Sequence, residues 1–239
     1  VIAKNEKGSI AGATYSSVLA GVSASQIASD TTQTVDLDGT DVTFTLAETS
    51  TSGTWDLSTQ AITDQSGQVV HIDNTTIQDV TITNNGTIWS TENNAIEFDG
   101  TTISNTATIT NNTDATIRSD STAIDEAAIV IKDTTGSLSI NNTGTMTGPH
   151  GLLVDNATVT FTNRGTVTGS LYDVNNAGTL TINNNQGALT SDPLTLTGKL
   201  PTYNMLIVNT EDYGQLAVTN GTGTLDFDVA DTSKLESKD

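Results

Sequence analysis

Hydrophobic and polar residues alternate strictly in five similar segments along the middle of the chain. Each segment reads apolar, polar, apolar, polar, Asn, then a short turn and another apolar residue. Strict alternation of Thr with Ile and Val is typical of β-strands, and the 3.6-residue period of helices is missing. The five segments are 80–88, 107–117, 138–146, 159–167 and 180–189. Self-similarity of this kind predicts a repeat fold.

The spacing of the segments indicates which repeat fold this is. Their central apolar residues are Ile82, Ile109, Ile140, Phe161 and Ile182, so the repeats are 27, 31, 21 and 21 residues long. One repeat holds about three short strands, because apolar pairs also lie between the segments. These pairs are Ile96 and Phe98, Ile129 and Ile131, Leu152 and Val154, and Leu171 with Val174.

These strands predict an all-β fold, a right-handed single-stranded parallel β-helix (solenoid) with β-rich terminal capping segments. The two longer repeats predict inserted loops near 89–94 and 118–126. We divide the chain into 1–68, an N-terminal β-rich capping or assembly segment; 69–190, the parallel β-helix; and 191–239, a C-terminal β-rich capping segment. The ends of a solenoid expose unpaired backbone and need such caps.

Residue types in the repeats agree with this geometry. Inward positions such as Ile140, Phe161 and Ile182 would fill a narrow core, whereas Thr suits outward positions because it is both β-branched and polar. We expect the Asn at each strand end to tolerate a left-handed turn and the glycines that follow to let the chain turn. We also expect these Asn side chains to stack as an amide ladder along the axis. The candidates are Asn84 or Asn85, Asn111 or Asn112, Asn142, Asn163 and Asn184.

Composition and charge narrow the possible functions. The chain has 47 Thr and 21 Asn but only 3 Pro, which favours strands and turns over a flexible linker. Its net charge of −20 argues against nucleic acid, which needs clustered Lys and Arg, and opposes docking on anionic membranes. No apolar stretch approaches the ~18 residues of a membrane-spanning helix. Cysteine is absent, which for a secreted protein of this size favours a bacterial surface, so we expect an extracellular location.

One cluster of acidic residues is a candidate calcium site. Asp36, Asp38 and Asp41 surround the turn at Gly39, and carboxylate oxygens are the ligands that calcium prefers. The cluster lacks the downstream Glu of an EF-hand loop. A solvated β-turn between strands at 35–37 and 42–44 explains it equally well, so the expected cofactor is none, with calcium possible.

The residue types of the chain give little support for a catalytic function. Within 69–190 the basic residues are Arg118, Lys132 and Arg164, and we interpret the two arginines as solvated turn residues. His71 and His150 are the only imidazoles, and no Gly-X-Ser-X-Gly elbow occurs. We therefore predict no catalytic residue and no enzyme, with polysaccharide processing as the alternative.

Two aromatic residues, Trp89 and Tyr172, leave a sugar-binding interpretation open beside the simpler one of core or turn packing. Exposed aromatic rings can stack on sugars, but aromatic residues make up only 4% of the chain, too few to form a platform. A glycan or another surface ligand therefore stays a possible partner.

The chain resembles the passenger domains of bacterial autotransporters. The Asn-Asn-Gly-Thr-Ile repeats carry the resemblance together with Tyr-Gly-Gln-Leu-Ala-Val-Thr-Asn-Gly-Thr-Gly-Thr-Leu at 213–225, which is similar to their C-terminal folding core. The stretches at 14–22 and 53–57 resemble what usually follows that core. The resemblance implies a surface adhesin or fibre, and less often an enzyme or toxin. The membrane-embedded barrel of such proteins is absent from these residues, which suggests a released or non-autotransporter relative.

The order of the two flanking signatures is swapped, because the stretch that usually follows stands here at the front. Head-to-tail joining of subunits would restore the usual order, as would a tandem array. Permutation within a monomer, with residues 1–20 packed on the chain's own C-terminal strands, is the other alternative. We expect an extracellular structural protein, a β-helical subunit of a surface fibre or filament assembled head-to-tail by strand complementation. A monomeric surface adhesin that binds glycans or host surfaces is the alternative.

Overall fold

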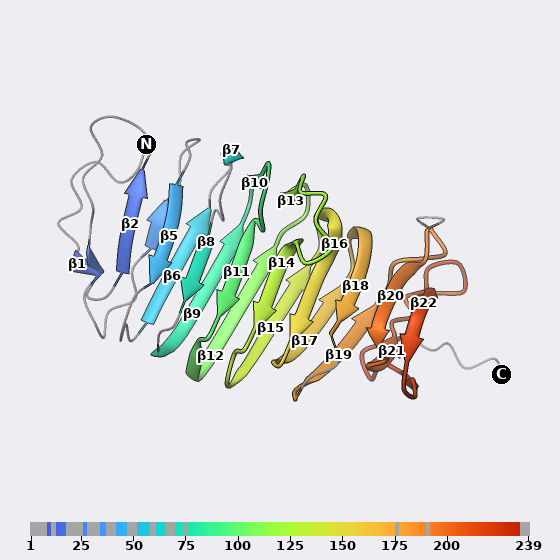
Figure 1. Ribbon diagram of the computed structural model, residues 1–239. Helices are drawn as coiled ribbons and strands as arrows, with labels where there is room; N and C mark the ends of the chain where they lie inside the picture. The colour runs from blue at the N-terminus through green and yellow to red at the C-terminus, as the bar shows by residue number, and fades with distance from the viewer. Residues whose placement is uncertain are drawn as a thin grey trace.

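The computed structural model is all-β, with parallel strands stacked as a solenoid of about six turns (Figure 1). The predicted parallel β-helix is therefore confirmed. The structure describes residues 9–10, 13–17, 26–27, 34–36, 42–46, 52–57, 61–65, 70–73, 76–174, 177–189 and 192–234, with side chains at 70, 72 and from 80 onward. No helix occurs among these residues.

Each turn of the solenoid, called a coil below, contributes strands to three faces. Face 1 is a nine-stranded sheet of β4 (Thr34–Asp36), β6 (Ser52–Leu57), β9 (Thr76–Asn84), β12 (Thr102–Asn111), β15 (Ser137–Asn142), β17 (Thr158–Asn163), β19 (Thr179–Asn184), β21 (Thr202–Met205) and β23 (Asp226–Val229). All of its strands pair in parallel with their neighbours.

The other two faces share a second sheet. Face 2 contains β7 (Ala61–Gln65), β10 (Thr87–Ser90), β13 (Thr116–Ser119) and the first parts of β16 (Thr145–Asp155) and β18 (Thr166–Asp173). Face 3 contains β5 (Val42–Leu46), β8 (Val70–Asp73), β11 (Ile96–Asp99), β14 (Ala127–Lys132), the second parts of β16 and β18, β20 (Leu194–Lys199) and β22 (Leu216–Thr222).

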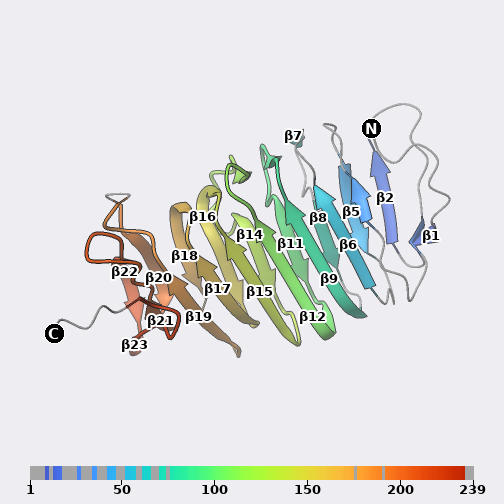
Figure 2. The same ribbon diagram turned by 180° about the vertical axis from the view of Figure 1, so that it is seen from behind.

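The N-terminal strands lie at one end of this stack. β2 (Ala13–Ser17) pairs antiparallel with β5, and β1 (Ser9–Ile10) pairs with β3 (Gln26–Ile27). β2 and β23 stand at opposite ends of the solenoid (Figure 2). The intramolecular permutation is therefore wrong for β2, since this strand does not reach the chain's own C-terminal strands.

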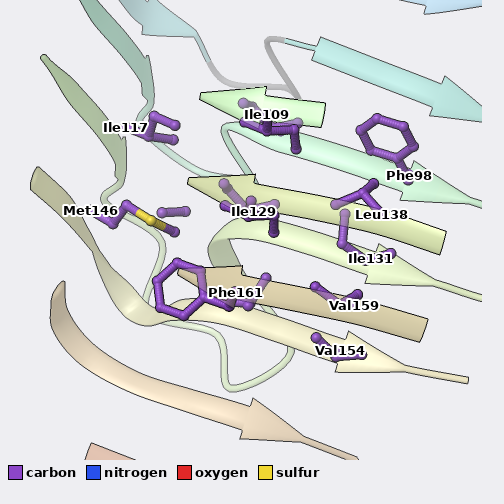
Figure 3. Close-up of a cluster of buried hydrophobic side chains, with 14 of the residues drawn as sticks. Phe98, Ile109, Ile117, Ile129, Ile131, Leu138, Met146, Val154, Val159 and Phe161 are labelled. Carbon is purple, nitrogen blue, oxygen red and sulfur yellow. The ribbon is translucent and has the colours of Figure 1, made fainter. Parts of the chain in front are cut away.

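The register confirms the sequence repeat. Ile82 lies opposite Ile109, and the same column continues through Ile140, Phe161 and Ile182. All five side chains are fully buried, as expected when alternate residues of every strand face a common core. Figure 3 shows Ile109 and Phe161 among the inward side chains that fill this core.

The structure extends this column beyond the repeats that the sequence pattern shows. Trp55 and Val35 precede Ile82, and Tyr203 and Phe227 follow Ile182. Parallel pairing thus continues on both sides of 69–190, while the division of the chain into three segments stays a prediction.

The two longer coils carry their extra residues where the pattern predicts loops. Residues 91–95 separate β10 from β11, and 120–126 separate β13 from β14. In the 21-residue coil the strands of face 2 and face 3 have no loop between them, and together they form the single strand β16. The pairing of Leu171 with Val174 was wrong in its second residue. The residue opposite Val154 is Asp173, which is 8% exposed, and Val174 lies one position beyond it.

The predicted amide ladder is confirmed, and of the two alternatives it runs through Asn84, not Asn85, and through Asn111, not Asn112. The side-chain nitrogen of Asn84 donates to Oδ1 of Asn111, that of Asn111 to Asn142, and that of Asn142 to Asn163, each over 2.8 Å. Asn163 donates to Asn184 over 2.9 Å, and Asn184 to the Tyr203 hydroxyl over 3.1 Å. All five Asn side chains are buried.

The prediction that Asn stands at these positions because it tolerates a left-handed backbone was wrong. None of the five has a positive φ, because each still belongs to its strand. Asn is required instead because its amide satisfies both the next amide and the backbone: Asn111 Nδ2 also donates to the Thr145 carbonyl over 3.0 Å. The glycines that follow lie in the turns as predicted, and Gly187 has a φ of 153°; at Gly165, a Cβ would also lie 2.1 Å from the Gly144 carbonyl oxygen. Close approach of adjacent coils explains Gly there.

Candidate functional site

Two of the three candidate calcium ligands lie outside the described residues. Asp36 ends β4, whereas Asp38 and Asp41 lie outside the described residues. Among the described residues no group of three or more His, Cys, Asp or Glu could hold a metal ion. The calcium site therefore stays a prediction.

The basic residues of the solenoid bind neighbouring carboxylates or face water. The Arg118 guanidinium binds Asp120 through Nη2 at 2.8 Å and lies 4.7 Å from the centre of the Trp89 ring. Lys132 Nζ lies 3.2 Å from Asp99 Oδ2, and this hydrogen bond and charge raise the pKa of Lys132. Arg164 is exposed in the turn after Asn163.

The two aromatic residues considered for sugar stacking are engaged in packing. Trp89 Nε1 donates to Asp120 Oδ2 over 2.9 Å while Arg118 lies over its ring. Tyr172 packs against a small outer cluster of buried residues, and its ring centre lies 5.0 Å from that of His150. Sugar binding at either ring therefore stays a prediction.

A cluster on the outer side of face 3 was missed by sequence reasoning. The outward positions of one register row are Glu97, Val130, Leu153 and Tyr172. Val130 and Leu153 are only 2% and 5% exposed, although outward positions elsewhere meet water. The signal in the sequence was the uninterrupted run Ala-Ala-Ile-Val-Ile at 127–131, because a strand buried on both sides loses its alternation.

The inserted loop 120–126, called the strap below, is fastened beside this cluster. His150 Nε2 donates to the Ile124 carbonyl over 2.9 Å, because a carbonyl can only accept. Its Nδ1 then accepts from the Ser170 hydroxyl over 2.6 Å. At the end of the strap, the Ala127 backbone N–H donates to Asn94 Oδ1 over 2.8 Å. Burial lowers the pKa of His150, which favours the neutral ring.

Glu126 is the unusual group of the strap. Its Oε2 is buried without a hydrogen-bond partner. Burial, with Glu97 and then Asp125 nearby, raises the pKa of Glu126 from 4.5 to about 7. The Ser170–His150 pair next to it has a backbone carbonyl where a catalytic triad has a carboxylate, so this geometry does not assemble a triad.

The C-terminal end of the solenoid is the second notable surface. Phe227 of β23 occupies the inward column and stacks on Tyr203 with ring centres 5.7 Å apart. Phe227 is nevertheless 55% exposed, whereas Tyr203 one coil earlier is 1% exposed. Val218 of β22, opposite the buried Leu196, is 47% exposed. Two strands of one coil thus present core positions with no further described coil to cover them.

Comparison of the chain with protein-family models, curated proteins and solved structures finds no match. Within the part of the chain that the structure describes, no helix is long and apolar enough to cross a membrane. The class defined by fold alone is a parallel β-solenoid, and any function must be argued from the surfaces described above.

Proposed function

We propose that this chain is an extracellular structural protein, a β-helical subunit of a bacterial surface fibre or filament that assembles head-to-tail by strand complementation. The observation that carries the proposal is the exposed Phe227 at an inward position of the last strand of face 1. Its partner is a further copy of the same chain.

The physical argument rests on the two strands that end the described part of the solenoid. β22 and β23 are edge strands, so the backbone groups on their outer edges have no partner strand among the described residues. A further coil, with one strand on each of these two faces, would pair those groups and cover Phe227 and Val218 at the same time. A head-to-tail contact of this kind generates a filament unless its rotation closes a ring.

The opposite end offers a strand of matching character. β4 is the other edge of face 1, and its Thr34-Val35-Asp36 alternates as Asp226-Phe227-Asp228 does in β23. Both strands run in the same direction within a parallel sheet, so a copy placed end-on in the same orientation would extend face 1 in parallel, whereas the second sheet ends on this side in β2, which pairs antiparallel with β5.

The resemblance to autotransporter passenger domains supports the surface location, and the swapped order of the two flanking signatures supports joining between chains. The net charge of −20 keeps separate subunits soluble.

Sedimentation velocity over a concentration series, with electron microscopy of the same samples, tests the proposal. We expect concentration-dependent assembly and fibres for the wild type, and loss of both in Phe227→Asp. The matched control is Ile124→Asp, because Ile124 is also an exposed apolar residue, at 81%, but lies in the strap. Far-UV circular dichroism verifies that each variant keeps its β-structure. A wild type that stays monomeric at every concentration and forms no fibres overturns the proposal.

A further inference from the structure

Faces 1 and 3 end half a coil apart, and this offset defines how two copies would meet if the proposed head-to-tail assembly is correct. Apart from β1, β3 and the strands of face 2, the chain alternates between the two faces: β2 lies beside β5 on face 3, β4 is on face 1, and the alternation continues to β22 on face 3 and β23 on face 1. The described stack therefore begins on face 3 with β2 and finishes on face 1 with β23.

Each end carries the half coil that the other end lacks. Among the described strands, none continues face 3 past β22 to the height of β23, and none continues face 1 past β4 to the height of β2. Since β2 and β23 stand at opposite ends of one copy (Figure 2), they can meet only between copies. A second copy placed end-on would set its β2 beside β23, and the two half coils would make one coil.

The two faces would pair in different directions across such a joint. On face 1, eight parallel pairings keep one register column from Val35 to Phe227. Its continuation sets Val35 of one copy opposite Phe227 of the other, and Thr34 then lies opposite Asp226. On face 3, β2 runs antiparallel to β5 and hence to β22, so that pairing would be antiparallel.

Face 2 is closed before the C-terminal end by a side chain that takes the place of a strand. The Val167 backbone N–H donates to Gln186 Oε1 over 2.7 Å, and Gln186 Nε2 donates to the Val167 carbonyl over 3.0 Å. A neighbouring parallel strand would satisfy the same two backbone groups. Gln186 is 2% exposed and also accepts a hydrogen bond from Asn163 Nδ2 over 3.1 Å. Within the described part of the chain, no strand of face 2 follows β18.

We propose that copies interlock by their half coils, with β23 pairing with β4 of the next copy, β22 pairing with its β2, and face 2 left out of the joint. The interlock covers Val218 with β2 and Phe227 with β4, so both exposed core positions gain neighbours. It also pairs the free backbone edges of both faces, which a contact through one face alone would leave open.

Disulfide trapping between copies tests the interlock, because the chain has no cysteine of its own. Neighbouring strands lie about 4.8 Å apart, within the distance of about 4.4–6.8 Å between Cα atoms that a disulfide spans. For face 1, Thr34→Cys is mixed with Asp226→Cys. For face 3, Thr14→Cys and Ser16→Cys are each mixed with Thr219→Cys, since the antiparallel register is open by a few residues.

The matched control places the same cysteines on face 2. Thr63→Cys in β7 is mixed with Thr168→Cys in β18. We expect at least about fivefold more disulfide-linked dimer from the face 1 mixture and from one face 3 mixture than from this control. Each variant incubated alone should give as little dimer as the control, because like ends do not meet. Far-UV circular dichroism verifies that every variant keeps its β-structure.

Hydrogen exchange followed by NMR tests the closure of face 2. In the wild type we expect assembly to slow exchange of the β22 and β23 amides by about tenfold or more and to leave the Val167 amide unchanged. Gln186→Leu should speed exchange at Val167 about tenfold before any assembly. Gln215→Leu is its control, because the hydrogen bond from Gln215 to Gln186 uses the backbone N–H.

Two kinds of failure are distinguishable. If the wild type assembles but face 3 gives no trapped dimer, or if face 2 traps as much as face 1, the interlock is wrong and head-to-tail assembly stands. An assembled wild type in which Val167 gains protection would equally rule out a closed face 2. A wild type that sediments as a monomer at every concentration, with no trapped dimer in any mixture, overturns the proposed function together with the interlock.

Discussion

The side-chain amide of Asn142 donates to Oδ1 of Asn163 over 2.8 Å, although the two residues are 21 positions apart in sequence. Both side chains are buried between adjacent coils. Each amide of the ladder is donor to one neighbour and acceptor from the other, so removal of one member takes one buried hydrogen bond from each of its two neighbours.

Substitution of one ladder residue should therefore be costly. We expect Asn142→Ala to lower the free energy of unfolding by about 2–4 kcal/mol, because Asn111 loses its acceptor and Asn163 loses its donor inside the protein. The control is Asn141→Ala, one position away on the partly exposed outer surface, with an expected change within about 0.5 kcal/mol. Urea denaturation followed by circular dichroism measures both. Equal effects would mean that the ladder contributes nothing beyond ordinary packing.

The inward column provides a test of register. Ile140 is fully buried, and we expect Ile140→Asp to destabilise the protein by several kcal/mol because an unpaired charge cannot be solvated there. Ser139→Asp introduces the same side chain one position away at an exposed site and should change stability by less than about 0.5 kcal/mol. Thermal denaturation distinguishes the two variants. A reversed order would place residue 139 inward, a shift of one residue in every strand that pairs with it.

The pH dependence of stability should reveal Glu126. Its pKa is about 7 in the folded protein and 4.5 for an ordinary, solvated glutamate, so between these values the folded state holds a proton that the unfolded chain has lost. The free energy of unfolding therefore falls as pH rises through this window. The stabilisation is complete below about pH 4.5 and lost above about pH 7. We expect about 1 kcal/mol, less than the full linkage value, because the carboxyl is partly exposed.

Comparison with a variant isolates this contribution from the rest of the strap. The lowered pKa of His150 acts in the opposite direction, since its contribution is lost as pH falls below about 6.5. Glu126→Gln should remove the loss of stability between pH 4.5 and 7, whereas Glu92→Gln, at an exposed site, should leave it unchanged. Denaturant titrations at several pH values provide the measurement. Identical pH profiles for wild type and Glu126→Gln would exclude a buried, protonated Glu126.

Much of the fold could be predicted because it repeats locally. Alternation identified the strands, the spacings of 27, 31, 21 and 21 located the inserted loops, and the recurring Asn predicted the ladder. Such features need only the sequence, because each coil has the same neighbours above and below it. The choice between Asn84 and Asn85 required the tertiary structure, since only one of two adjacent side chains can face the core.

The remaining features depend on contacts between segments that share no pattern. Phe227 joins the column of Ile82 although its surroundings carry no Asn repeat, and only the pairing of β21 with β23 reveals this. The raised pKa of Glu126 likewise arises because the strap brings it near Glu97, 29 residues earlier in the chain. Alternation and turn residues act over a few positions, and so the sequence by itself determined strands, repeat and core column. Burial of a carboxylate and exposure of a terminal core residue depend on what packs beside them in space, which only the tertiary structure decided.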